Sequence, residues 1–170
     1  MTPVAFRDAT PADSAALSAL ARRSFTETFG HLYKPDDLAA FVARQTPEAW
    51  AGELGDPGYA VRIGEDAAEA VAFAKLGPPS LPFEPRGSAI ELRQFYLLSP
   101  WHGSGVAGEM MAWAVATARE RAADDLYLSV FVDNHRARRF YERHGFERIG
   151  KYAFMVGNHE DEDDVMRLKL

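Results

Sequence analysis

The sequence predicts one α/β domain built on a mixed, mostly antiparallel sheet with flanking helices. Two observations lead to this prediction. Residues 58–77 and the C-terminal tail, 146–170, both read as hairpins, with runs typical of strands on either side of a turn. Between them, residues 89–132 contain a single strand–helix–strand pattern, which is too little for a serial parallel sheet. A chain of 170 residues fits one domain, 1–170, with a substantial core.

The N-terminal part is expected to form a strand followed by three helices. The strand is VAFRDA, residues 4–9. The first helix begins at Thr10, where Pro11 suits the first helical position and Asp13 completes a variant of the capping box. Two proline-containing segments start the second and third helices, at Pro35 and Thr46.

The middle of the chain is expected to form a hairpin, a loop and the crossover. The hairpin 58–77 is predicted to turn at Gly64-Glu65-Asp66, and four prolines make 78–87 a loop. A strand over 89–98 then leads through a glycine-rich segment into a long helix, 103–123.

The C-terminal part is expected to form a strand, a short helix and a second hairpin. The strand 126–132 is followed by a helix over 134–144 that is capped by Asp133 or Asn134 and stops at Gly145. The tail contains strand patterns at 146–154 and 164–170 around an acidic turn.

Composition excludes several classes of protein. The N-terminus lacks the pattern of a signal peptide, and no apolar run is long enough to span a membrane, so a cytoplasmic protein is expected. The chain has no cysteine, which excludes disulfides, thiolate metal sites and a cysteine nucleophile. The net charge of −6 disfavours nucleic acid as a partner. The five histidines show no metal-ligand spacing, so no metal is predicted. A homodimer is possible, and the sequence does not decide the oligomeric state.

The segment GSGVAG, 103–108, matches the fingerprint of a dinucleotide-binding turn. However, Ser99-Pro100-Trp101-His102 separates it from the preceding strand, and the second nucleotide-binding half of such a fold is missing. An anion site for a pyrophosphate fits better, because Gly103 and Gly105 permit positive φ and the following helix offers its N-terminus. A plain turn that only joins strand to helix is the alternative.

The surrounding residues resemble the GCN5-related N-acetyltransferases. Their acetyl-CoA loop reads Q/R-x-x-G-x-G/A, which His102-Gly103-Ser104-Gly105-Val106-Ala107 matches, with His102 in place of Gln or Arg. Asn134, Ala137 and Phe140-Tyr141 are similar to the family's second cofactor segment, and the resemblance covers about 89–148 well. It implies a sheet with a splayed central pair of strands. Helices 103–123 and 134–144 should then cover opposite faces of the sheet or opposite sides of the cleft.

The resemblance also implies the site. The pantetheine of acetyl-CoA would insert beside the strand that ends in Tyr96, Leu97 and Leu98, and the amide of Leu97 would polarise the thioester carbonyl. The cofactor residues are therefore expected to be Tyr96, Leu97, Leu98, His102, Gly103, Ser104, Gly105, Val106, Ala107, Asn134 and Tyr141.

Acetyl transfer to an amine needs an acid for the leaving thiolate and a base for the ammonium. Tyr141 is the predicted general acid, because a phenol with a pKa near about 10 is protonated at neutral pH. A core tyrosine is the alternative. Glu91 is the predicted base, directly or through water, with an exposed strand carboxylate as an equal alternative. Glu27, in the segment FTETF, could line the acceptor side, although solvation on a helix surface explains it more simply.

The acceptor is predicted to be a small-molecule primary amine. The segments 25–33 and 151–170 resemble the polyamine N-acetyltransferase (PaiA-like) branch, which favours a substrate such as spermidine. The acidic run 159–164 could attract such a polycation, although a solvated hairpin turn is the simpler interpretation. A protein or peptide N-acetyltransferase and a catalytically silent acetyl-CoA sensor are the alternative functions.

Overall fold

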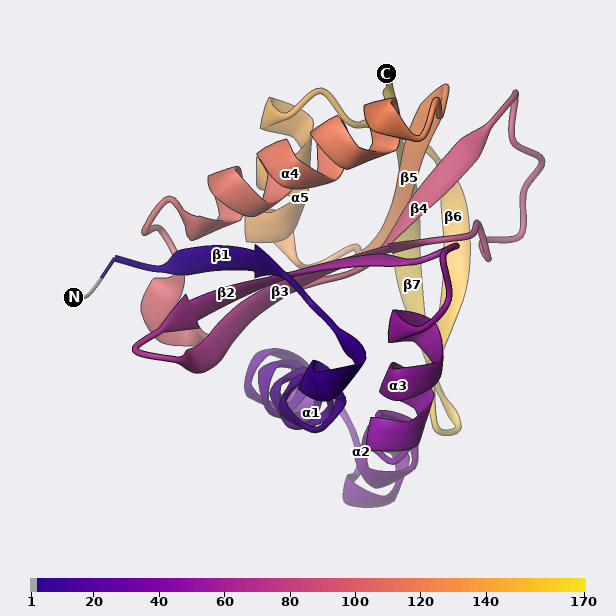
Figure 1. Ribbon diagram of the computed structural model, residues 1–170. Helices are drawn as coiled ribbons and strands as arrows, with labels where there is room; N and C mark the ends of the chain where they lie inside the picture. The colour runs from indigo at the N-terminus through magenta and orange to yellow at the C-terminus, as the bar shows by residue number, and fades with distance from the viewer. Residues whose placement is uncertain (1–2) are drawn as a thin grey trace.

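The computed structural model describes residues 3–170, which form a seven-stranded sheet with helices on both faces (Figure 1). The strand order is β1-β2-β3-β4-β5-β7-β6, and every neighbouring pair is antiparallel except β4 with β5. The strands are β1 (Ala5–Asp8), β2 (Ala60–Asp66), β3 (Glu69–Gly77), β4 (Ala89–Leu97), β5 (Asp125–Phe131), β6 (Glu147–Val156) and β7 (His159–Lys169). The helices are α1 (Ser14–Phe29), α2 (Pro35–Val42), α3 (Pro47–Leu54), α4 (Val106–Glu120) and α5 (His135–Arg143). The predicted fold class is confirmed.

The parallel pair β4 and β5 separates along its length. The two strands pair only over 89–91 and 125–127. Beyond this point β4 continues along β3 as far as Leu97, while β5 continues along β7 as far as Phe131. The two strand edges that face each other in this stretch therefore have no sheet partner, and the centre of the sheet is open.

Helices α4 and α5 lie on the same face of the sheet, and α1, α2 and α3 lie on the other (Figure 1). Both α4 and α5 contribute to one hydrophobic core, whereas Leu17 of α1 and Trp50 of α3 belong to another. Of the two arrangements expected for these helices, opposite faces of the sheet is therefore wrong, whereas opposite sides of the cleft is not contradicted. The reason is topological: β4–α4–β5 and β5–α5–β6 both join parallel strands and move in the same direction across the sheet. Right-handed crossovers of this kind place their helices on one face.

The hairpin of β2 and β3 is present, but its turn is not where the glycine predicts. Gly64 lies within β2, where a Cβ atom would come within 3.1 Å of Val4 Cγ1 and 3.4 Å of the Ala72 side chain. The chain instead reverses at Ala67 and Ala68, whose φ angles are 48° and 70°. Gly64 is thus explained by the close approach of neighbouring side chains, and the turn uses two alanines in the left-handed region.

The acidic run 159–164 is not a solvated turn. The reversal occurs before it, at Gly157 and Asn158, and the run forms the beginning of β7. Alternation along this strand places Asp161 and Asp163 on one face, and both are buried. The prediction of a solvated turn was wrong because the charge of a segment does not fix its burial. Sheet pairing with β5 and β6 buries Asp161, Asp163 and Asp164, while Glu160 and Glu162 remain exposed. Within residues 3–170 no helix is both long and apolar enough to cross a bilayer.

Candidate active site

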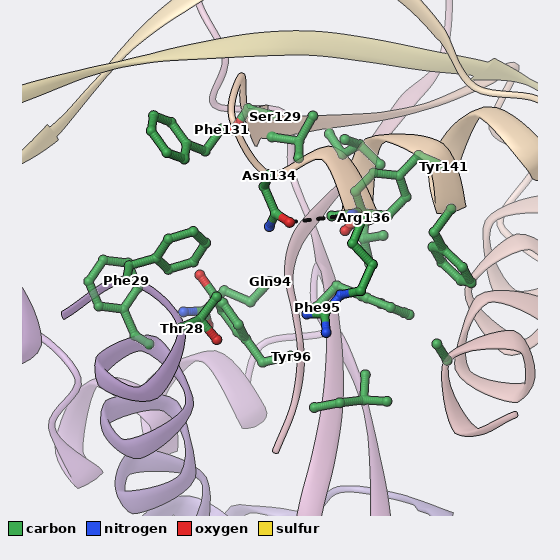
Figure 2. A pocket seen from close by; sticks show the side chains of 18 of the residues that line it. Thr28, Phe29, Gln94, Phe95, Tyr96, Ser129, Phe131, Asn134, Arg136 and Tyr141 are labelled. Atoms are coloured by element: carbon green, nitrogen blue, oxygen red, sulfur yellow. Dashed lines mark hydrogen bonds between the residues drawn. The ribbon is translucent and has the colours of Figure 1, made fainter. Parts of the chain in front are cut away.

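A cavity of about 430 Å³ lies where β4 and β5 separate. Figure 2 shows side chains that surround it, which come from α1 (Thr28, Phe29), β4 (Gln94, Phe95, Tyr96), β5 (Ser129, Phe131) and α5 with its N-cap (Asn134, Arg136, Tyr141). The glycine loop between β4 and α4 and two aspartates of β7 also line it. Segments that are far apart in the sequence therefore line the same cavity.

The glycine loop presents free backbone amides at the N-terminus of α4. Gly103 and Gly105 have φ angles of 74° and 90°, and Gly105 is the residue that precedes the helix. Among the hydrogen bonds of residues 3–170, none is donated by the amides of Gly103 or of 105–108. The positive end of the helix dipole adds to these donors, so the loop suits a phosphate-sized anion.

The backbone of Leu97 faces the gap between the separated strands. The amide of the next residue, Leu98, donates to Val71 of β3 at 3.0 Å. Because backbone groups alternate between the two edges of a strand, the amide and carbonyl of Leu97 point toward β5. The predicted oxyanion donor is therefore directed into the open centre of the sheet. Leu98 itself is buried beneath the sheet, with its amide occupied, so its prediction as a cofactor contact is wrong.

His102 connects three elements of the site. Its Nε2 lies 3.0 Å from the carbonyl oxygen of Leu97, and its Nδ1 lies 2.5 Å from Nη1 of Arg136 on α5. Since a guanidinium can only donate, Nδ1 accepts and Nε2 carries the proton. Burial, together with the nearby Arg136 charge, lowers the pKa of His102 and favours this neutral form. The side chain that departs from the family pattern thus holds the end of β4 against α5.

Two further predicted residues line the cavity from α5 and its cap. Asn134 caps α5, because its side chain accepts a hydrogen bond from the amide of Ala137 at 3.3 Å (dashed line in Figure 2). Tyr141 is buried among the rings of Phe95, Phe140 and Phe146, and burial raises its pKa far above the usual value for a phenol. The Tyr141 hydroxyl is therefore protonated at every physiological pH.

Of the remaining predicted residues, Glu91 does not reach the cavity. Its carboxylate accepts hydrogen bonds from the amides of Ser80 and Leu81 at 2.9 and 3.2 Å, and so anchors the loop 78–88. It does not line the cavity because it lies where β4 and β5 are still paired. The placement contradicts Glu91 as the base. Glu27 pairs with Arg23 on the surface of α1 at 2.9 Å and does not line the cavity either.

Ser104 and Val106 belong to the glycine loop, but their side chains do not line the cavity. The Ser104 hydroxyl donates a hydrogen bond to the carbonyl oxygen of Trp101 at 2.5 Å. Val106, the first residue of α4, is buried in the hydrophobic core between α4 and the sheet. The other predicted cofactor residues do line the cavity: Tyr96, Leu97, His102, Gly103, Gly105, Ala107, Asn134 and Tyr141.

One wall of the cavity, formed by residues after α1 and in β6 and β7, was not predicted from the sequence. Tyr33 donates a hydrogen bond to Asp161, and His159 lies 3.0 Å from the other oxygen of that carboxylate. Aromatic rings of Phe25, Phe29, Phe131 and Phe154 complete this wall. The only signal for it in the sequence was the resemblance of 25–33 and 151–170 to one branch, because no motif connects residues so far apart.

The site can be compared with what acetyl-CoA requires. Its pyrophosphate needs clustered donors, which the loop amides and the nearby Arg136 supply, and its amide-containing arm needs an unpaired strand edge, which β4 supplies. The residues that are present therefore fit this group.

Comparisons with known proteins agree with this interpretation. The chain is 32% identical to an uncharacterized N-acetyltransferase of Mycobacterium bovis over 159 residues, which cover 93% of this chain and 98% of the relative. The crystal structure of the PaiA N-acetyltransferase from Thermoplasma acidophilum, in complex with coenzyme A, superimposes with a TM-score of 0.80 at 16% identity. That match covers 99% of this chain and all of the other. The ribosomal-protein-S18-alanine N-acetyltransferase of Escherichia coli gives a TM-score of 0.70 at 15% identity, covering 98% of this chain and 94% of that one.

A sequence model of the acetyltransferase (GNAT) family matches residues 15–146, a range that extends from α1 to the end of α5 and includes the glycine loop. Together with the relatives and the geometry above, this match identifies the chain as a member of the GNAT family of acetyltransferases, which use acetyl-CoA as acetyl donor.

Proposed function

We propose that this protein transfers an acetyl group from acetyl-CoA to a primary amine of a small polycation such as spermidine. One observation carries the proposal: a single cavity is lined by the glycine loop, by the unpaired end of β4 and by two buried carboxylates, Asp161 and Asp163. The first two features suit the donor. The carboxylates suit a positively charged acceptor, because a buried negative charge is stabilised by a cation.

Each residue has a chemical task in this proposal. Acetyl-CoA supplies a thioester, whose carbonyl carbon forms a bond to the amine nitrogen while its bond to sulfur breaks. The Leu97 amide stabilises the negative charge that develops on the carbonyl oxygen. Tyr141 gives its proton to the leaving sulfur. The amine nitrogen loses one proton as the neutral amide forms, and this proton restores that of Tyr141.

The chemistry of the acceptor wall favours a polyamine. Its aromatic rings, from Phe25, Phe29 and Phe154, can cover apolar methylene groups, and they also attract cations over their faces. Asp161 and Asp163 provide negative charge in the same wall. Alternating methylene segments and ammonium groups are the defining pattern of spermidine and spermine.

Released CoA should be measured with spermidine, free lysine, aminoglycosides and short peptides with free N-termini as acceptors. The proposal expects the highest kcat/KM with spermidine. Activity on peptides without activity on spermidine would instead identify a peptide N-acetyltransferase.

A catalytically silent acetyl-CoA sensor would give a different result in this assay. Acetyl-CoA would still raise the thermal stability of the protein, since a ligand stabilises the folded state by RT ln(1 + [L]/Kd). No amine in the panel would release CoA. Stabilisation by NAD in place of acetyl-CoA would contradict both proposals.

A further inference from the structure

Three aspartates of β7 have different surroundings. Asp164 forms ion pairs with Arg138 at 3.2 Å and with Arg148 at 2.7 Å. Asp161 accepts a hydrogen bond from Tyr33 on one oxygen and faces His159 on the other. Both carboxylates are therefore held by partners within the protein.

Asp163 has no charged partner. It is 6% exposed and lines the cavity, yet among the ion pairs of residues 3–170 none involves it. The Ser129 hydroxyl on β5 is its hydrogen-bonding neighbour. A buried carboxylate without a cation is costly, and such a group is normally paired or neutralised.

A polar atom of the cavity wall has no hydrogen-bond partner at all within the described residues. Gln94 Oε1 on β4 is buried and accepts no hydrogen bond within the described residues, and Gln94 lines the same cavity as Asp163 (Figure 2 labels Gln94). Both groups are acceptors, and a primary ammonium has three N–H donors. A ligand nitrogen in this part of the cavity would satisfy them together.

The geometry points to Asp163 as the catalytic base that removes a proton from the acceptor ammonium, with Gln94 orienting the nitrogen. The inference rests on the proposed function and assigns the step that Glu91 cannot perform. One proton passes from the ammonium to the Asp163 carboxylate, and the nitrogen lone pair that is freed forms the bond to the acetyl carbon. Tyr141 protonates the sulfur, the second nitrogen proton replaces that of Tyr141, and the proton on Asp163 returns to solvent after the product leaves.

The charges around Asp163 suit this task. The pKa of Asp163 is raised to about 7. Burial is the largest cause, the charges of Asp161 and Asp164 act in the same direction, and the Ser129 hydrogen bond partly opposes them. Tyr96 of β4 and Tyr33 after α1 also face it, and Tyr152 is its neighbour on β6. A carboxylate that titrates near neutral pH is efficient at accepting a proton.

The raised pKa of Asp163 also affects the stability of the folded protein, which should fall as pH rises. The folded protein holds the Asp163 proton up to a higher pH than the unfolded chain does, so ionisation of Asp163 costs stability as pH rises from about 4 to 7. Asp163→Asn removes this cost. The variant should have a higher Tm than the wild type at pH 8, and the difference between the two Tm values should be smaller at pH 5.

The kinetic experiment uses the best acceptor of the amine panel and compares Asp163→Asn with Asp164→Asn. We expect kcat/KM of the wild type to rise with pH and level off above about 7. Asp163→Asn should lower kcat/KM at pH 8 by about 10²-fold and abolish the rise near pH 7, with the affinity for acetyl-CoA unchanged. Asp164→Asn, in which the carboxylate held by two arginines is lost, should still show the rise of kcat/KM with pH. Its midpoint should move to a slightly lower pH, because the Asp164 charge no longer raises the pKa of Asp163.

A fluorinated analogue of the same acceptor sharpens the test. Its electron-withdrawing substituent leaves the nitrogen unprotonated at neutral pH, so a base is no longer needed. Asp163→Asn should then react with the analogue nearly as fast as the wild type does. If Asp163→Asn raises only KM and keeps the wild-type pH profile, the carboxylate binds the cation without acting as the base and the inference is wrong. If the wild type acetylates no amine at all, it is the proposed function that fails.

Discussion

The proposed donor side and the proposed acceptor side of the cavity are built in different ways. The donor side uses backbone groups: the amides of the glycine loop and the unpaired edge of β4 at Leu97. The acceptor side uses side chains, such as Tyr33 and Asp161, that meet from the two ends of the chain. Backbone groups are available whatever the neighbouring side chains are, so a donor side of this kind can be kept while the acceptor side changes.

This difference predicts that substitutions on the two sides change different kinetic parameters. Changes on the donor side should alter acetyl-CoA affinity or kcat with every acceptor. Changes on the acceptor side should alter KM for the amine and leave acetyl-CoA binding intact.

The largest effect is expected for Tyr141→Phe. The ring packing among Phe95, Phe140 and Phe146 is kept, but the proton donor is lost. We expect kcat to fall by about 10²-fold with every acceptor, while acetyl-CoA affinity by calorimetry stays the same. An unchanged rate of acetyl transfer in a single-turnover assay would remove Tyr141 from the chemistry.

Gly105→Ala should have a smaller effect that is confined to donor binding. Gly105 has a φ of 90°, and holding a residue with a Cβ in the left-handed region costs about 1–2 kcal/mol. The loop should therefore shift, and acetyl-CoA affinity should weaken by about tenfold.

Gly52→Ala on α3 is the matched control for Gly105→Ala. A Cβ there meets nothing within 4 Å, and alanine favours the helix. Acetyl-CoA affinity should be unchanged in this variant. Equal affinity of the Gly105→Ala protein would argue against phosphate binding by the loop.

Tyr33→Phe tests the acceptor side. Phenylalanine keeps the stacking of this ring on Phe25 but loses the hydrogen bond to Asp161. We expect KM for the amine to rise by about fivefold, with kcat and acetyl-CoA affinity close to the wild-type values. A fall in kcat with unchanged KM would mean that the two sides are not separable in this way.

The smallest effect is expected outside both sides, at the turn between β2 and β3. Ala67 and Ala68 both have positive φ, and Asn-Gly is the preferred pair for such a turn. The double substitution Ala67→Asn and Ala68→Gly should stabilise the protein by about 1 kcal/mol, which corresponds to about 2–4 °C in Tm. Thermal unfolding at neutral pH measures this shift, and the kinetics should be unaffected. A lower Tm would contradict the assignment of this turn.

The sequence by itself determined the mixed sheet with the crossover from β4 through α4 to β5, the glycine loop and the cap of α5. These features depend on local chemistry: Gly103 and Gly105 are needed for positive φ, and Asn134 satisfies an amide at the start of α5. The same local signals failed where packing set the outcome. Gly64 indicated a turn but serves a close contact within a strand, and Glu91 suggested a base but anchors a loop.

Only the tertiary structure decided the acceptor side. Tyr33 and Asp161 are 128 positions apart in the chain, and no periodicity or motif connects them. The burial of Asp163 depends on the pairing of β7 with β5 and β6, so a run of acidic residues that looks solvated in the sequence becomes part of a cavity. The physical reason is that desolvation and charge pairing are set by neighbours in space, whereas backbone conformation is set largely by neighbours in sequence.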